Sequence, residues 1–358
     1  DCFVDGKFVF KDNIPADQNL FTAGSGNKNL KVGIRAAGIV VNCLVKENEA
    51  TNNGGGVYVH HAGQLHNSIV RDNESRRDAG GVDMYGTDGA VYNCLVVGNH
   101  ADGSIGGVQA RQGNTVVNTT IVGNNHNTTY DDRISWAGFR ADHETEDDYN
   151  DKLFVNNVIW GNKHNGEVIA EQVMSNLQYY AAKGKFANNA LQGTTNVNAT
   201  YIALSKNNDP QFKADYSFPL SSPLYNAGTN DAVAKILGNK DVYGNARKQG
   251  ANIEIGAVEH KEYTATVELG EGGTLEVDYT GKKTPLAAGK ISVPAGFTTK
   301  LYVTPAENYV LETITLNGKA LEAEKGVYTI PAVTGNITLK VEFDCTLTLY
   351  KVAAGENL

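Results

Sequence analysis

The chain has 358 residues, a formal net charge of −9 at pH 7 and 41% hydrophobic residues. This length predicts two or three domains with a sizeable core, and the composition is that of a globular chain, which excludes a wholly disordered one. The acidic balance argues against a nucleic-acid partner, which would need a basic surface, and no run of 18 apolar residues marks a membrane-spanning helix.

A repeat of about 25 residues is the first feature met along the chain. Each copy carries two asparagines six positions apart, with a short apolar run between them. The leading asparagines are Asn42, Asn67, Asn93, Asn118 and Asn156, the second ones are Asn48, Asn73, Asn99, Asn124 and Asn162, and a degenerate copy follows at residues 186–191. Self-similarity at such a period is typical of solenoids.

A second run of β type follows a Gly-Gly or Ala-Gly pair in each of four copies, at residues 57–60, 82–85, 108–111 and 139–142. Each repeat therefore holds two or three short strands, separated by Gly and Asn residues that tolerate the left-handed backbone of tight bends. No copy contains a helical pattern, which excludes leucine-rich and ankyrin-type repeats. We expect an all-β fold over residues 1–204, a right-handed parallel β-helix with about 25 residues per coil, followed by a small β-rich module.

The GGGVYV string at residues 54–59 and the NCLV string at residues 42–45 resemble those of pectin lyase-like parallel β-helix proteins that bacteria secrete or display. The resemblance covers about residues 30–195 and implies the fold and an extracellular or cell-surface location. The resemblance implies almost nothing about activity. The chain opens at Asp1 without a signal-peptide pattern, so we expect a signal peptide or an anchor to lie outside this sequence.

Residues 205–261 lack the repeat and carry four motifs in order: DPQF at 209–212, LSSPLYNAG at 220–228, DVYGNAR at 241–247 and IGAVE at 255–259. The series resembles the segment that follows β-helices in choice-of-anchor bacterial surface proteins. Because a bare β-helix end exposes strand edges and apolar interior, we expect this segment to cap that end. Arg247 and Glu259 are interpreted as an internal ion pair of the cap in preference to catalytic groups.

Residues 262–344 alternate apolar and polar residues in short runs punctuated by Gly and Pro, which predicts a separate small β domain. The strings VPAGF at 293–297, LYVTP at 301–305 and ITLNG at 314–318 are similar to internalin B-repeat modules, which are β-rich spacer or adhesion units of bacterial surfaces. CTLTL at 345–349 repeats the pattern of YTATV at 263–267. We therefore expect residues 345–358 to begin a second module that the chain does not complete.

Four cysteines do not predict a disulfide framework in a chain of this length. Cys43 and Cys94 occupy the same position of the repeat two coils apart, a separation of about 9–10 Å that a disulfide cannot span. We expect both to be small buried residues of the core. Nothing in the sequence supports a bond between Cys2 and Cys345.

Alternation along the second run separates the coil interior from its surface. Its apolar positions should fill the interior: Val57, Val59, Val82, Met84, Val108, Ala110, Phe139 and Ala141. The opposite positions form two adjacent columns of candidate carbohydrate-binding residues: Tyr58, His60, Asp83, Tyr85, Gln109, Arg111, Arg140 and Asp142. Aromatic rings stack on sugars, and guanidinium, amide and carboxylate groups bind hydroxyls or carboxylates, so an extended face of this kind suits a sugar polymer.

The longest interruption of the repeat spans residues 125–152 beside the last of these runs. It contains Trp136, which we add to the candidate binding face, and the acidic residues Asp131, Asp132, Glu144, Glu146, Asp147 and Asp148. These carboxylates lack the ligand spacing of an EF-hand, so we predict no metal site and read them as solvated acids, with Ca²⁺ as the one ion left open. No P-loop, dinucleotide-binding, HExxH or CxxC motif predicts a cofactor.

Three functions remain open. The first, favoured by the surface-type resemblances, is a secreted or cell-surface protein that binds a polysaccharide or host glycan or acts in adhesion. The second is a polysaccharide lyase or glycoside hydrolase, with paired carboxylates for hydrolysis, or with Arg111, His60 or Tyr85 as a lyase base beside Arg140 or Ca²⁺. No motif assigns a catalytic residue to either class. The third is a structural stalk without a small ligand. The oligomeric state is not predicted.

Overall fold

The computed structural model describes residues 2–4, 8–9, 34–36, 38–128, 137–142, 145–170, 172–173, 177–193, 202–204, 208–231, 239–248, 251–279 and 282–347. The chain divides into two compact units, Asp1–Glu259 and His260–Leu358, and each is described by itself. The segments expected over residues 1–204 and 205–261 fall, up to Glu259, within the first unit.

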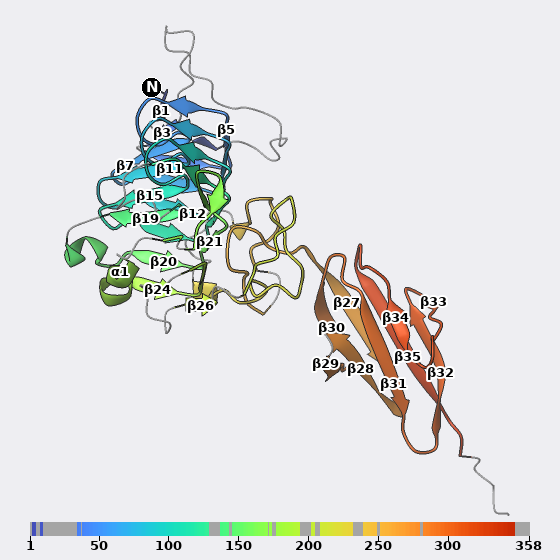
Figure 1. The fold of residues 1–358 in the computed structure, drawn as a ribbon. Helices are drawn as coiled ribbons and strands as arrows, with labels where there is room; N and C mark the ends of the chain where they lie inside the picture. The colour runs from blue at the N-terminus through green and yellow to red at the C-terminus, as the bar shows by residue number, and fades with distance from the viewer. Residues whose placement is uncertain are drawn as a thin grey trace, which may run out of the picture. The chain divides into compact units, whose positions relative to one another are not determined.

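The first unit is a parallel β-helix, in which each strand pairs with the equivalent strand of the neighbouring coils (Figure 1). Sheet A contains β1 (Cys2–Val4), β3 (Ile34–Ala36), β7 (Val57–His60), β11 (Val82–Tyr85), β15 (Val108–Arg111) and β19 (Phe139–Asp142). Sheet B contains β2 (Phe8–Val9), β4 (Ile39–Val41), β8 (Gln64–His66), β12 (Ala90–Tyr92), β16 (Thr115–Val117), β20 (Leu153–Val155) and β24 (Lys185–Ala187).

Two further sheets complete the coils. Sheet C contains β5 (Leu44–Lys46), β9 (Ile69–Arg71), β13 (Leu95–Val97), β17 (Thr120–Val122), β21 (Val158–Trp160), β25 (Asn189–Leu191) and β26 (Ile202–Leu204). Sheet D contains β6 (Glu49–Ala50), β10 (Glu74–Ser75), β14 (His100–Ala101), β18 (Asn125–His126), β22 (Lys163–His164) and, antiparallel to β22, β23 (Glu167–Val168). A regular coil thus has four strands where two or three were predicted, because the two-residue strands of sheet D are too short to show an alternating pattern.

The core of the first unit lies inside the coils. The eight apolar residues predicted to face inward from sheet A, from Val57 to Ala141, are all completely buried, which confirms the predicted alternation. Among the described residues, the 3-10 helix η1 (Glu146–Tyr149) and the helix α1 (Leu177–Lys183) lie outside the sheets. Their tyrosines Tyr149 and Tyr180 are fully buried, with ring centroids 4.9 Å apart, beside Phe154 of β20.

The coil corners explain why the repeat is rich in asparagine and glycine. The leading asparagines stand between sheets B and C, where their φ angles lie between 47° and 56°: Asn42, Asn67, Asn93, Asn118, Asn156 and Asn188. Asparagine adopts this left-handed conformation more readily than most residues with a Cβ. At the corner between sheets C and D the φ angles of Glu47, Asp72, Gly98, Gly123 and Gly161 are also positive, from 55° to 67°.

The second asparagines form a buried column inside the coils, which we call the asparagine ladder: Asn48, Asn73, Asn99, Asn124 and Asn162. In each step, one side-chain oxygen accepts hydrogen bonds from the asparagine of the preceding coil. Asn99 Oδ1, for example, accepts from the backbone N of Asn73 at 3.0 Å and from its Nδ2 at 2.8 Å. Asn73 Nδ2 also donates to the Val45 carbonyl at 3.0 Å. The ladder ends on Gln172 and satisfies backbone groups inside an apolar core.

The cysteines of the repeat occupy a neighbouring inward column, beside the leading asparagines. Cys43 and Cys94 are buried free cysteines, as predicted. Burial raises the pKa of the Cys43 thiol to about 11 and that of Cys94 to about 12, so both stay protonated and unreactive. Cys345 is an exposed free cysteine, and the side chain of Cys2 lies outside the described residues.

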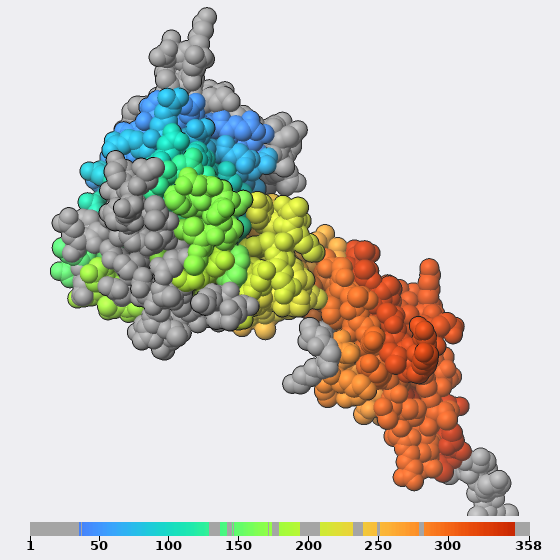
Figure 2. All heavy atoms as spheres, in the orientation of Figure 1, coloured from blue at the N-terminus to red at the C-terminus, as the bar shows by residue number. Residues whose placement is uncertain are grey.

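The described residues between 208 and 259 (208–231, 239–248 and 251–259), which we call the flank segment, lie along the side of the coils, where they form the yellow band of Figures 1 and 2. The segment bonds to the leading asparagines of successive coils: the Nδ2 atoms of Asn93, Asn156 and Asn188 donate to the carbonyls of Lys240, Thr229 and Ala227 at 2.7, 3.0 and 2.9 Å. It also buries Ile253, Ile255 and Ala257 against outward apolar residues of sheets B and C. The sequence predicted a cap on the end of the stack; these contacts instead cover its flank.

Arg247 anchors the flank segment to the coils. Its guanidinium is completely buried, donates from Nη1 to Asn93 Oδ1 at 3.0 Å and forms an ion pair with Glu259, with Nε and Oε1 3.1 Å apart. Arg247 Nη2 donates to the Glu254 carbonyl at 3.0 Å. The predicted internal ion pair is therefore present. A buried arginine with several acceptors holds a structure together, since removing it would leave buried groups unpaired.

The second unit has two sheets. One contains, in spatial order, β30 (Gly289–Pro294), β27 (Glu262–Leu269), β35 (Ile337–Cys345), β32 (Tyr309–Leu316) and β33 (Lys319–Ala320). The other contains β29 (Lys282–Pro285), β28 (Gly273–Tyr279), β31 (Thr299–Pro305) and β34 (Tyr328–Ile330). Cys345 ends β35 by pairing with Tyr309, so it belongs to this unit, and the expected second module lies almost entirely outside the described residues.

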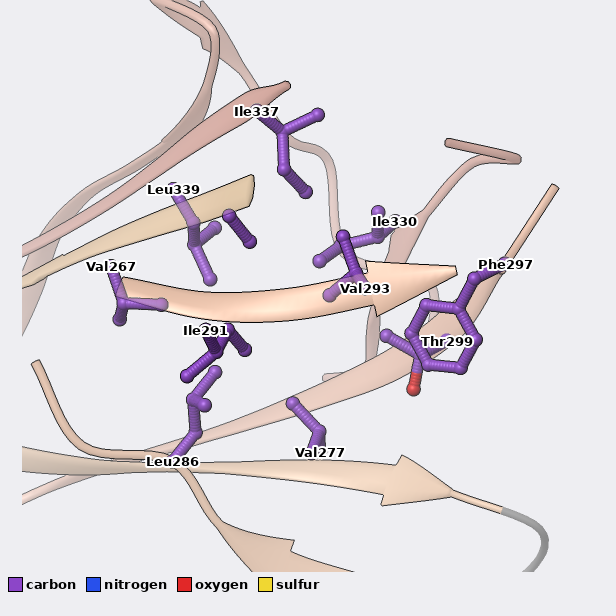
Figure 3. Close-up of a pocket in the computed structure, with 11 residues that line it drawn as sticks. Val267, Val277, Leu286, Ile291, Val293, Phe297, Thr299, Ile330, Ile337 and Leu339 are labelled. Atoms are coloured by element: carbon purple, nitrogen blue, oxygen red, sulfur yellow. The ribbon is translucent and has the colours of Figure 1, made fainter. Parts of the chain in front are cut away.

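A gap between the two sheets of the second unit is lined by side chains of their strands and of the adjoining loops (Figure 3). Val277, Ile291 and Leu339 are typical of its apolar lining. Among the described lining residues, the one hydroxyl is that of Thr299, which donates to the Asp278 carbonyl at 2.8 Å. This gap is part of the hydrophobic core, because its described lining is otherwise apolar and that hydroxyl is already hydrogen-bonded. No helix described in either unit is long and apolar enough to cross a membrane.

Candidate functional site

The two columns predicted on the outer face of sheet A are brought together by the strand register. Strand pairing aligns Tyr58 with Asp83, Asp83 with Gln109 and Gln109 with Arg140 in the first column, and His60 with Tyr85 and Arg111 with Asp142 in the second. Asp142 is described only for its backbone, and Trp136 lies outside the described residues. The face divides into an aromatic part and a polar part.

The aromatic part, which we call the aromatic platform, consists of Tyr58, His60, His61 and Tyr85. The rings of Tyr58, His60 and Tyr85 have centroids 6.0–6.3 Å apart and interplanar angles of 14–27°, so they are nearly parallel. His61 stands edge-on to His60, with centroids 4.2 Å apart. Tyr85 is 43% exposed, and His61 is also exposed.

His61 is the member of the platform that the sequence reasoning missed. It follows β7 at the corner between sheets A and B, where a φ of 48° turns its ring back towards the strand. The equivalent corner positions are Gly86 and Gln112, which also have positive φ angles. The adjacent histidines His60 and His61 were the available signal, but strand alternation alone assigned only His60 to the outer face.

The polar part, which we call the polar row, consists of Asp83, Gln109, Arg111 and Arg140. Arg111 Nε donates to Asp83 Oδ1 at 3.1 Å, and Arg111 Nη2 makes a longer bond of 3.4 Å to Gln109 Oε1. Arg140 Nη1 donates to Ser104 Oγ at 3.2 Å. Burial raises the pKa of the Asp83 carboxyl to about 6, although the neighbouring Arg111 guanidinium acts in the opposite direction.

The polar row is much less exposed than the sequence predicted for an outward face. Asp83 and Gln109 are buried, and Arg140 is 9% exposed. The corner that precedes β7 passes close to this face, because a Cβ on Gly54 would lie 3.3 Å from Asp83 Cβ. Because residue 54 is a glycine, this corner can cover Asp83, and strand alternation alone does not predict such a contact. The side chain of Arg111 keeps 26% of its surface exposed and is the accessible cation of the described row.

The insertion beside sheet A is described only in part. Asp131, Asp132 and Glu144 lie outside the described residues, whereas Asp148 accepts a hydrogen bond from Thr145 Oγ1 at 2.7 Å. Within the described ranges, no group of three or more His, Cys, Asp or Glu side chains is arranged to hold a metal ion. The prediction that the insertion holds no metal site, with Ca²⁺ left open, therefore stays a prediction.

The described side chains of this face offer contacts to a ligand and assign no reaction. Asp83 is the one carboxylate among the described side chains of the two columns, and it is buried against Arg111. Hydrolysis by a pair of carboxylates would need a second acid about 5–10 Å away. The platform offers aromatic rings, of which Tyr85 and His61 are exposed, and Arg111 offers N–H donors.

Comparison with known proteins identifies no relative: no family model, no curated protein and no solved structure matches the chain.

Proposed function

We propose that this chain is a bacterial secreted or cell-surface protein that uses the outer face of sheet A to bind a carbohydrate polymer, either a polysaccharide or a host glycan. The observation that carries the proposal is the aromatic platform, in which three nearly parallel rings stand on two adjacent strands and Tyr85 is 43% exposed. Exposed, rigidly held aromatic rings provide the apolar surface on which sugar rings stack.

The geometry of a β-helix supports an extended ligand. Equivalent strands repeat at about 4.8 Å along the stack, so side chains of successive coils line up in a straight row. The resemblances of residues 205–261 to choice-of-anchor segments and of residues 262–344 to internalin B-repeat modules support display outside the cell. Adhesion through a surface glycan follows from the same binding face.

The proposal is tested by removing the two tyrosine rings. We expect the double variant Tyr58→Ala/Tyr85→Ala to bind glycan about 5- to 160-fold more weakly, since each lost stacking contact is worth about 0.5–1.5 kcal/mol. Affinity electrophoresis of the full chain against a panel of neutral and acidic polysaccharides measures this loss. Tyr243→Ala is the matched control, because Tyr243 is 45% exposed but lies on the flank segment.

The same experiment separates binding from the alternatives. Shortening of a bound polymer over time would assign the face to a lyase or hydrolase. Binding that is equal in the wild type and the double variant would remove the face from consideration. Absence of binding to every polymer of the panel would contradict the proposal and leave a structural stalk as the explanation.

A further inference from the structure

The position of Arg111 allows its guanidinium to contact a charged group of a sugar bound on the aromatic platform. Tyr85 and Arg111 each follow directly after the paired residues Met84 and Ala110, on neighbouring strands about 4.8 Å apart. Tyr85 is the most exposed ring of the platform's two tyrosines, and Arg111 is the most exposed cation of the polar row. A ligand that stacks on Tyr85 therefore comes within reach of the guanidinium.

The guanidinium of Arg111 is held in place with donors left over. Its hydrogen bonds within the described residues use Nε, towards Asp83 at 3.1 Å, and Nη2, towards Gln109 at 3.4 Å. Arginine has five N–H donors in a planar fork, so other donors stay available for a ligand. A fork fixed by protein partners loses little entropy on binding, and it matches a planar or tetrahedral anion in two-point contacts.

The charge of this part of the face also favours an anion. A ligand meets the partly exposed guanidinium of Arg111, whereas the carboxylate of its partner Asp83 is buried. The chain as a whole carries a net charge of −9, which repels polyanions. Selective binding of a polyanion by this chain therefore requires a locally exposed cation, and the Arg111 guanidinium supplies one.

We infer that the polymer bound on the aromatic platform is an anionic glycan, and that Arg111 selects it by binding a carboxylate or sulfate group of the sugar. The inference rests on the proposed function and names its class of ligand. Asp83 acts as an internal competitor, because its carboxylate occupies Arg111 Nε and cancels part of the charge that the ligand meets. Neutralising Asp83 therefore strengthens binding of an anionic sugar and leaves a neutral sugar unaffected.

The test compares polymers that differ only in their anionic groups. Hyaluronan, alginate and polygalacturonate are each paired with their carboxyl-reduced forms, and dextran sulfate is paired with dextran, which separates carboxylate from sulfate recognition. We expect the full chain to bind the anionic member of at least one pair about 10- to 100-fold more tightly, as charge-assisted hydrogen bonds of two-point geometry predict. Arg111→Gln removes this preference, and Arg111→Lys restores only part of it.

Two further variants test the role of Asp83 and show whether a lost preference comes from unfolding. Asp83→Asn should raise affinity for the anionic polymer several-fold without changing affinity for its neutral partner. Asp83→Asn/Arg111→Gln leaves no unpaired buried charge, and a melting temperature near that of the wild type shows that its lost preference is not unfolding.

The outcomes distinguish this inference from the proposed function. Equal affinity for both members of every pair would overturn the anionic ligand and leave glycan binding standing. An anionic preference that survives in Arg111→Gln would overturn the role of Arg111. Failure of every polymer to bind would overturn the proposed function itself.

Discussion

The asparagine ladder and the first outer column of sheet A are both rows of polar side chains that repeat once per coil. In the ladder, five successive coils carry asparagine, and the Nδ2 of each of the first four donates to the Oδ1 of the next. In the outer column, the aligned residues are Arg35, Tyr58, Asp83, Gln109 and Arg140, and no two neighbours are alike. Both rows stack on the same backbone, so stacking alone does not dictate the residue type.

The difference between the two rows separates side chains that the coil requires from those that it only tolerates. A ladder asparagine satisfies backbone groups that would otherwise be buried without partners, so every coil needs the same amide. The residues of the outer column differ from coil to coil, so no single side chain recurs there to satisfy the same backbone group in every coil. Asp83 even raises the free energy of the folded state when it is ionised, because burial disfavours its charge. Side chains that lower the stability of the folded state are expected at functional sites.

The largest effect is expected from breaking the ladder. Asn99→Ala removes the acceptor of two bonds from Asn73 and the donors to Val70 and Asn124, all inside the core. We expect the free energy of unfolding to fall by about 3–5 kcal/mol, measured by urea denaturation. The control Asn127→Ala, at an exposed position, should change it by less than about 0.5 kcal/mol. Equal losses in the two variants would contradict the structural role of the ladder.

A smaller effect is expected at Asp83, whose ionisation makes the free energy of unfolding depend on pH. Its folded pKa of about 6 lies above the ordinary 3.8, so the folded state holds this proton more tightly than the unfolded chain. The contribution of Asp83 to stability is therefore full below pH 3.8 and is lost as pH rises through 6. Asp83→Asn should remove that slope and make the protein more stable than the wild type above pH 6, by at most about 2–3 kcal/mol.

Denaturation of the wild type and Asp83→Asn at pH 5 and pH 8 checks this sign. Asp102→Asn serves as the control, because the Asp102 side chain is 52% exposed. If the free energies of unfolding of the wild type and Asp83→Asn change in parallel with pH, ionised Asp83 does not destabilise the folded state. The outer column would then not differ from the asparagine ladder in its effect on stability.

The smallest effect on stability is expected in a third row of aligned positions, the corner between sheets C and D, which extends the comparison. Gly123 has a φ of 67°, and a Cβ there would meet no atom within 4 Å, so only backbone strain opposes a side chain. We expect Gly123→Ala to cost about 1 kcal/mol, and Gly123→Asn to cost less, since asparagine tolerates this conformation. Thermal denaturation measures both. Equal costs would mean that the corner does not select residues by their φ preference.

Much of the β-helix could be predicted because its determinants are local. The period, the inward positions from Val57 to Ala141 and the buried free state of Cys43 and Cys94 all follow from which residues recur at one spacing. The candidate columns were predicted for the same reason, since strand alternation assigns them without any knowledge of distant contacts. The fourth strand of each coil was missed because two residues carry no alternation.

What the sequence determined by itself is therefore the coil: its length, its inner and outer columns, and the aligned candidates of sheet A. The tertiary structure decided what covers those columns. It placed the flank segment along the side of the coils through contacts such as Arg247 to Asn93, which are 154 residues apart. It also buried Asp83 beneath a glycine corner, left Arg111 partly exposed, and added His61 to the platform. Periodicity specifies repeated local neighbours, whereas contacts between unlike segments form only when the whole chain has packed.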